Sequence, residues 1–247
     1  GSEMCIRDRA IPEFNTRFTR HMLIDTQPKD FNTLVRLSGF SHGTDVWMGN
    51  ARELILSGTA SVLETVGCRD DIMLYLISKG LDPKMSFKIM EKVRKGKVKK
   101  GGFDEGWVEA MRDHDVPEWY IDSLAKIGYL FPKAHAVAYV MMAFRIAWFK
   151  VHRPLEFYSA YFYRRSQKDA FDAGLMLKGR DFVRRKINEI KSKSDATAKE
   201  EDLVTTLEAV YEFYMRGFEF APMDLYECDA AKFLVVDEKR LRPPFVA

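Results

Sequence analysis

The stretch YLFPKAHAVAYVMMAFRIAWFKVH, residues 129–152, decides the fold class. An aromatic turn with Pro132 opens it, and apolar residues then occupy nearly every face of the helix that follows. A helix that is apolar all round is typical of a protein interior, so we expect it to be the central helix of a helical core. Arg145 interrupts the apolar run, which therefore falls short of the roughly 18 uninterrupted apolar residues of a membrane span.

The rest of the chain has the composition of a globular protein. It has 247 residues, of which 47% are hydrophobic and 30% charged. Helical periodicity recurs along most of it, as in residues 14–22, where an apolar side chain returns every four residues. Convincing strand patterns are confined to residues 218–246, where residues 233–236 and Leu241 flank a polar turn. We therefore predict a mainly α fold with a small β-hairpin near the C-terminus.

Three segments differ in composition. Residues 1–10 begin with Gly-Ser and show no hydrophobic period, so we expect a non-native, tag-like tail. Residues 11–165 carry the regular helical pattern and are predicted to form a helical core. Residues 166–247 start more polar and rich in lysine, and we expect them to form a second part of the same region.

The sequence holds no pattern for a metal or hydrolase site. None of the five histidines falls in a recognised ligand spacing, and there is no phosphate-binding glycine loop or nucleophile elbow. The three cysteines, Cys5, Cys68 and Cys228, are few and far apart. This spacing argues against a disulfide framework or a zinc site and favours a reducing, cytoplasmic compartment.

A basic segment stands out against a net charge of only +3. Residues 84–100 hold eight Lys and Arg side chains and a single acid, Glu91. Three of the lysines are spaced by four, so they share one helical face, where like charges repel. The segment is either a solvated surface or a surface that contacts the phosphates of DNA. The DNA-binding candidates are Lys88, Lys92, Lys95 and Lys97.

The start of the long helix is a candidate anion site. Lys133 and His135 lie beside the free backbone N–H groups of a helix N-terminus, and Tyr139 lies one turn further on the same face. The alternative is a histidine hydrogen-bonded inside the core, with Lys133 exposed. Upstream, we expect residues 38–45 to be a loop, either offering N–H and hydroxyl groups to an anion or simply connecting two helices.

Four motifs carry a family resemblance: SGFSHGTDVW (38–47), GCRDDIM (67–73), VPEWYID (116–122) and YLFPKAHA (129–136). In this order they resemble C-family bacterial replicative DNA polymerases of the PolC type, the DNA polymerase III alpha subunit of Gram-positive bacteria. The resemblance extends from about Ile11 to Phe245. It implies the fingers region, which is helical and covers the incoming deoxynucleoside triphosphate (dNTP).

The resemblance also implies roles for particular residues. Basic side chains of the fingers would hold the triphosphate, and template DNA would pass nearby. The nucleotide-binding candidates carried over by position are Lys133, His135, Tyr139, Ser41, His42, Arg69, Arg94 and Arg145. We expect the helix start, the 38–45 segment and the lysine-rich segment to converge into one basic cup. No catalytic residue is expected here, because the resemblance places the palm aspartates and their Mg²⁺ upstream of this chain.

The resemblance implies partners as well. They are primer–template DNA and dNTP and, for the full-length protein, the sliding clamp and other replisome subunits, with no membrane involved. A duplex-binding region would follow the last residues of this chain. The chain alone is expected to bind nucleotide or DNA weakly and to lack polymerase activity. The alternative from another class is a stand-alone, non-catalytic helical module that binds DNA.

Overall fold

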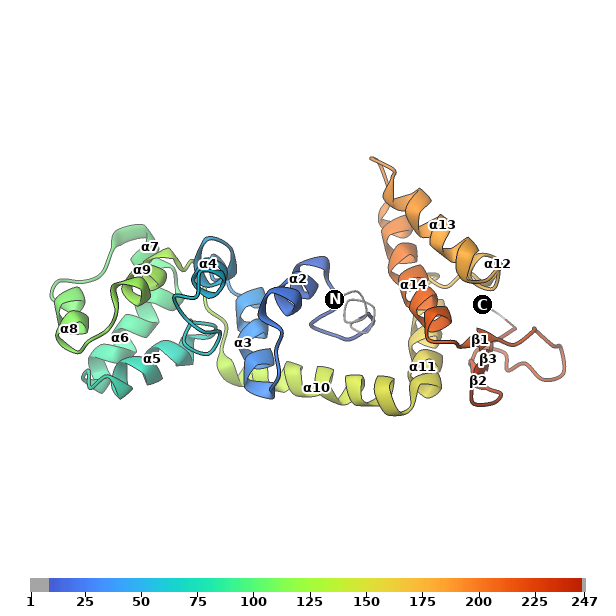
Figure 1. The fold of residues 1–247 in the computed structure, drawn as a ribbon, viewed down its shortest axis with the longest axis horizontal. Coiled ribbons are helices and arrows are strands. Elements are labelled where there is room, and N and C mark those ends of the chain that lie inside the picture. Colours follow the sequence, from blue (N-terminus) through green and yellow to red (C-terminus); the bar gives the residue numbers. More distant parts are fainter. Residues whose placement is uncertain (1–8, 246–247) are drawn as a thin grey trace. The chain divides into compact units, whose positions relative to one another are not determined.

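The computed structural model describes residues 9–245, which divide into two compact units (Figure 1). We call residues 16–143 the helical unit, and residues 144–245 together with 9–15 the C-terminal unit. The boundary falls inside the long helix α10 (Lys133–His152), and not after residue 165, where the composition changes. A change in surface polarity therefore does not mark the boundary between the two packed units.

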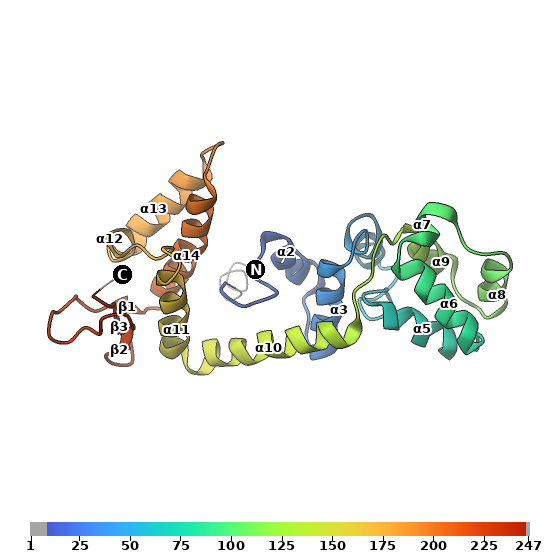
Figure 2. The ribbon, with the colours of Figure 1, turned by 180° about the vertical axis from the view of Figure 1, so that it is seen from behind.

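The helical unit is built from short helices in the order that the sequence patterns indicate. They are α2 (Arg17–Thr26), α3 (Phe31–His42), the π-helical turn η1 (Trp47–Ala51), α4 (Arg52–Leu56), α5 (Arg69–Ser78), α6 (Pro83–Arg94), α7 (Lys97–Gly101), α8 (Trp107–Asp113), α9 (Glu118–Lys126) and the first part of α10. Helices α5 and α6 lie side by side in both views (Figures 1 and 2). Residues that point from α6 into the core include Ile89 and Val93, both fully buried.

Helix α3 corrects one prediction. We expected residues 38–45 to be a loop because of their small and polar residues, but α3 continues through His42. Its Gly39 lies so close to the segment before α5 that a methyl group there would come within 3.0 Å of the Gly67 carbonyl oxygen. The glycine thus permits close packing of two segments, and it does not end the helix.

The N-cap of α3 makes stability depend on pH. Asp30 accepts a hydrogen bond from the backbone N–H of Thr33 at 2.8 Å, and this bond lowers the pKa of Asp30 from its ordinary value of 3.8. A carboxylate whose pKa is lower in the folded state contributes stability above its unfolded pKa and loses it as the pH falls through the folded pKa. In thermal unfolding between pH 2 and 6, Asp30→Asn is therefore expected to lose less stability than the unmodified chain, because asparagine caps without titrating. Equal losses in the two proteins would contradict this role.

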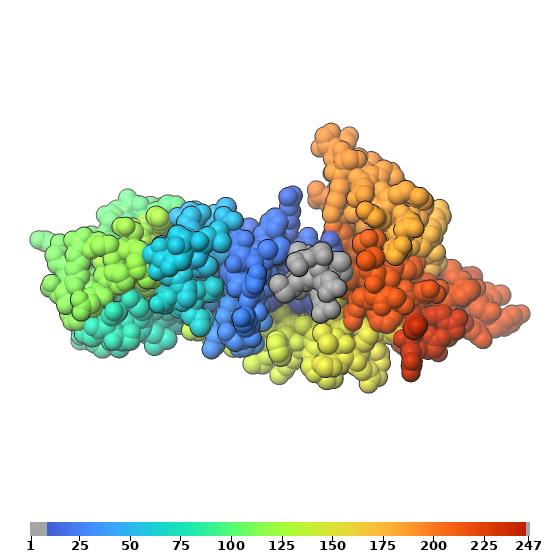
Figure 3. Space-filling model, viewed as in Figure 1, coloured from blue at the N-terminus to red at the C-terminus, as the bar shows by residue number. Residues whose placement is uncertain are grey.

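Helix α10 is not the core helix that its composition suggests. Only 22% of its most apolar window is buried, and its side chains are visible on the molecular surface in Figure 3. Phe144 is 56% and Trp148 50% exposed, whereas the charged Lys150 is buried. By length and composition alone the helix could also cross a membrane, which is weak evidence for a membrane span. Apolar residues on every face show what a helix could bury, and the packing of its neighbours decides what it does bury.

The C-terminal unit combines helices with a small sheet. After α10 come α11 (Pro154–Ser166), α12 (Ala173–Met176), α13 (Arg180–Lys191), α14 (Ala198–Met215), β1 (Glu219–Phe220), β2 (Leu234–Val235) and β3 (Arg240–Arg242). Strands β2 and β3 pair antiparallel, which confirms the predicted hairpin, and β1 adds to β3 in parallel. The fold is therefore mainly α with a small sheet near the C-terminus.

The core of this unit is aromatic. Rings from its helices and from the segments that carry the sheet pack around Phe162, whose ring centroid lies 5.8 Å from Phe213 and 5.7 Å from Phe220. Residues 1–8 of the expected tail lie outside the described residues. Arg9 and Ala10 do not behave as a tail, because Arg9 forms an ion pair with Glu208 and Ala10 is buried.

Candidate functional site

Four rings contact one another in succession at the start of α10, and we call them the ring ladder: His42 stacks on Phe131, Phe131 meets His135 edge-on, and His135 is tilted against Tyr139. His42 stacks on Phe131 with ring centroids 4.8 Å apart, and the next centroid distances along the ladder are 5.1 Å and 4.9 Å. His42, His135 and Tyr139 are exposed. The ladder therefore presents aromatic surface to solvent, and such surface can stack on a nucleobase.

Two short backbone bridges hold the segment before α10 in place. The backbone N–H of Thr44 donates to the Tyr129 carbonyl at 3.0 Å, and that of Arg69 donates to the Phe131 carbonyl at 3.1 Å. The ends of α3 and the start of α5 are thereby fixed beside the start of α10. Cys68 is buried at this junction, where burial raises the pKa of its thiol to about 12. The thiol therefore stays protonated and is no candidate nucleophile.

The first N–H group of α10 is not free, which corrects the predicted anion site. The backbone N–H of Lys133 donates to Asp70 at 2.8 Å, and its ammonium group lies 3.1 Å from a carboxylate oxygen of Asp71. Asp71 also pairs with Arg36 and accepts the backbone N–H of Cys68. The Lys133 side chain is still 39% exposed, so an incoming anion can reach its ammonium group.

The remaining nucleotide candidates occupy different places. Arg69 begins α5 beside this cluster, with its Nε 3.8 Å from Asp70. The hydroxyl of Ser41 donates back to the Ser38 carbonyl within α3. Arg94 ends α6, where it is hydrogen-bonded to Glu91. Arg145 lies three turns beyond the start of α10, in the part of the helix that belongs to the C-terminal unit, so the structure does not bring it to the ring ladder.

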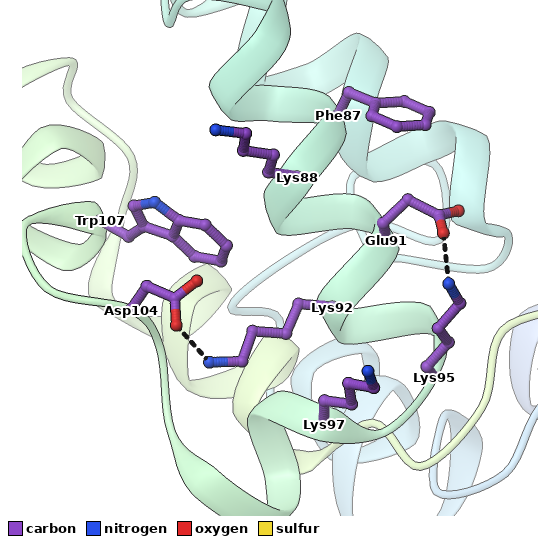
Figure 4. Close-up of a pocket in the computed structure, with 8 residues that line it drawn as sticks. All are labelled: Phe87, Lys88, Glu91, Lys92, Lys95, Lys97, Asp104 and Trp107. Carbon is purple, nitrogen blue, oxygen red and sulfur yellow. Dashed lines mark hydrogen bonds and ion pairs between the residues drawn. The ribbon is translucent and has the colours of Figure 1, made fainter.

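The four DNA-binding candidates lie together around an open groove of about 380 Å³, shown in Figure 4. We call it the α6–α8 groove. Its lining residues are Phe87, Lys88, Glu91, Lys92, Lys95, Lys97, Asp104 and Trp107. The lysines thus share one concave surface with two aromatic rings, which is more than a solvated helix face requires.

Ion pairs neutralise part of the charge in the groove. Lys92 pairs with Asp104 at 2.7 Å, and Lys95 pairs with Glu91 at 2.7 Å. Hydrogen bonds from Arg94 and Lys95 lower the pKa of Glu91 to about 2, so its carboxylate stays charged at neutral pH. Four lysines against two acids leave the lining with a net charge of about +2.

The single basic cup that we expected is wrong in part. The start of α10, the end of α3 and the start of α5 do converge at the ring ladder. None of the ladder residues lines the α6–α8 groove, however, so among the described residues there are two candidate surfaces. The basic segment still contacts the loop after α3, because Lys99 of α7 pairs with Asp45 at 2.8 Å.

Sequence reasoning missed four residues of these surfaces. Arg36 and Asp71 were missed because the ion pairs from Arg36 to Asp71 and from Asp71 to Lys133 join segments that are distant in the sequence. Trp107 escaped because the α6–α8 contact is not local. Phe87 could have been found, since it lies off the buried stripe of α6 that Ile89 helps to form.

Comparisons with known proteins agree with the motifs. A family model described as the bacterial DNA polymerase III alpha subunit finger domain matches residues 4–115. DNA polymerases III of the PolC type from Halalkalibacterium halodurans and Bacillus cereus are each 55% identical over 238 residues, which is 96% of this chain. The corresponding polymerase of Caldanaerobacter subterraneus is 53% identical over 234 residues, 94% of the chain.

The chain corresponds to the fingers region of PolC-type DNA polymerase III. It spans 16% of the length of these PolC-type relatives. The residues matched by the finger-domain model include all residues that line the α6–α8 groove. They also include His42 of the ring ladder and Arg69. Helix α10 lies beyond the residues matched by that model.

Proposed function

We propose that this fingers region binds the incoming dNTP and template DNA for a PolC-type DNA-directed DNA polymerase. The observation that carries the nucleotide part is that one helix start, that of α10, holds both the ring ladder and the partly exposed side chain of Lys133. A dNTP combines a polyanion with a flat base, and the start of α10 offers a cation, Lys133, and two exposed rings, His135 and Tyr139, within two helical turns.

In this proposal Lys133 and Arg69 neutralise the triphosphate. Lys133 exchanges part of its contact with Asp71 for a phosphate oxygen, while Asp71 keeps its ion pair with Arg36. Tyr139 and His135 stack on the base or sugar. Holding the phosphates in one orientation is most of what phosphoryl transfer requires of a protein.

The chemical step would reside in the rest of the parent protein. Its Mg²⁺ would be held by palm aspartates of that parent protein, and we assign Mg²⁺ to no residue of this chain. We propose the cytoplasm as the location, and the sliding clamp and other replisome subunits as partners of the full-length protein. Primer extension with the pure 247-residue chain is expected to yield no product; incorporation would contradict this assignment.

Replacing Lys133 by alanine tests the nucleotide site. In the full-length polymerase that carries this region, Lys133→Ala is expected to lower kcat/KM for dNTP about 10- to 100-fold, because a hydrogen bond to a charged group contributes roughly 1.5–3 kcal/mol. His135→Ala is expected to raise KM for dNTP through the loss of stacking. Steady-state kinetics at saturating primer–template measure both.

A matched control is Lys126→Ala, which removes an exposed lysine at the end of α9. Its kinetics should equal those of the unmodified enzyme. If Lys133→Ala and His135→Ala behave in the same way as this control, the nucleotide site lies elsewhere.

A further inference from the structure

Helix α6 carries an aromatic ring on its polar face. Its buried side chains are Ser86, Ile89, Met90 and Val93, whereas Phe87 stands outside this stripe and is 51% exposed. Phe87 therefore presents the face of an aromatic ring to solvent among lysines, and such a ring can stack on a base while the lysines contact phosphates.

Trp107 lies on the other side of the same lysines. In Figure 4 it is next to Lys88 and Lys92, while Phe87 is on the side of Glu91. The Lys92 ammonium lies 5.7 Å from the centre of the Trp107 ring, a cation–π distance. The lysines of α6 are therefore flanked by an aromatic ring on each side.

The lysines of the groove divide into two kinds. Lys92 and Lys95 are paired with carboxylates of the groove itself. Lys88 and Lys97 have no ion-pair partner in the part of the chain that the structure describes. Two uncommitted ammonium groups and an exposed ring thus face one open concavity.

We propose that the α6–α8 groove binds DNA in its unpaired, single-stranded form. Phosphates contact Lys88 and Lys97, and an unstacked base covers Phe87. A duplex cannot use this ring, because its bases are stacked and paired inside the helix; only a single strand presents base faces together with phosphates. The inference deepens the proposed template contact and rests on that part of the proposed function.

The test uses the 247-residue chain and a fluorescein-labelled dT12 oligonucleotide, compared with a 12-base-pair duplex. Fluorescence anisotropy is expected to show tighter binding of dT12 than of the duplex. Phe87→Ala should weaken dT12 binding roughly 5- to 150-fold, the range for one stacked base, and leave duplex binding unchanged. The matched control Phe18→Ala removes a phenylalanine of similar exposure, 43%, from α2 and should change neither.

The lysines have a separate signature in the salt dependence. Lys88→Ala combined with Lys97→Ala should reduce the slope of log K against log salt by about 1.4, since each phosphate contact on a single strand contributes roughly 0.7. The control pair Lys29→Ala and Lys168→Ala removes two exposed lysines outside the groove and should leave the slope unchanged. Binding of dT12 should also alter Trp107 fluorescence, measured as the difference from Trp107→Phe.

Equal or tighter binding of the duplex, or unchanged dT12 binding by Phe87→Ala, would overturn the single-strand inference. Either result leaves the dNTP site intact if Lys133→Ala still lowers kcat/KM in the full-length enzyme. Normal kinetics for Lys133→Ala together with the Phe87 effect would instead remove the dNTP site and retain the groove.

Discussion

Replacing Glu212 by alanine is expected to lower the free energy of unfolding of the C-terminal unit by about 3–5 kcal/mol. The Glu212 side chain is 1% exposed and lies 2.7 Å from the ammonium group of Lys150, itself 4% exposed. The Tyr158 hydroxyl also donates to this carboxylate. Removing the carboxylate takes away the negative charge that Glu212 places beside the buried Lys150 ammonium group, so less of the desolvation cost of that ammonium group is offset. Urea unfolding followed by circular dichroism measures the change.

Two further variants separate charge from volume. Glu189→Ala removes an exposed glutamate of α13 that pairs with Lys186, and a change within about 0.5 kcal/mol is expected. Glu212→Leu combined with Lys150→Met should recover part of the lost stability, because an apolar pair can replace a buried ion pair. A loss of under 1 kcal/mol in Glu212→Ala would show that solvent reaches the pair in solution.

Gly96→Ala is expected to destabilise the helical unit by about 2–4 kcal/mol. Gly96 joins α6 to α7 with φ of +66°, a left-handed conformation that costs a residue with a side chain roughly 1–2 kcal/mol. A methyl group there would also come within 3.0 Å of the Gly128 carbonyl oxygen. Since that oxygen belongs to the backbone, relief requires the two segments to move apart.

Two neighbouring glycines serve as controls for this variant. Gly101→Ala meets open space without a left-handed φ, so it should be neutral or slightly stabilising. Gly106→Ala meets open space in the same left-handed conformation, with φ of +76°, and should show the conformational cost alone. If Gly96→Ala costs no more than Gly106→Ala in thermal unfolding, the close approach to Gly128 is absent in solution.

The sequence predicted those elements whose causes are local. Residues 234–242 form the predicted hairpin, because two-residue periodicity acts over a few residues. The motifs predicted the PolC-type fingers region, and comparisons confirm it. Residues 38–42 were assigned wrongly, since Gly39 looks like a helix breaker until Gly67 is seen to pack against it.

The candidate sites were predicted only as separate pieces. The lysines of α6 could be named from spacing by four, and Lys133 and His135 from their place at a helix start. The sequence could not show that Asp70 and Asp71 bind Lys133 at this helix start, because these acids lie some sixty residues upstream. The sequence also could not show that Lys88 and Trp107 line the same groove.

By itself the sequence determined the helical class, the family and the set of charged and aromatic residues available for binding. The tertiary structure decided which of them meet: it exposed most of α10, buried Lys150 against Glu212, and separated the ring ladder from the α6–α8 groove. The physical reason is range. Propensity, capping and periodicity act within about one or two turns, whereas burial and ion pairing depend on segments that only the packed chain brings together.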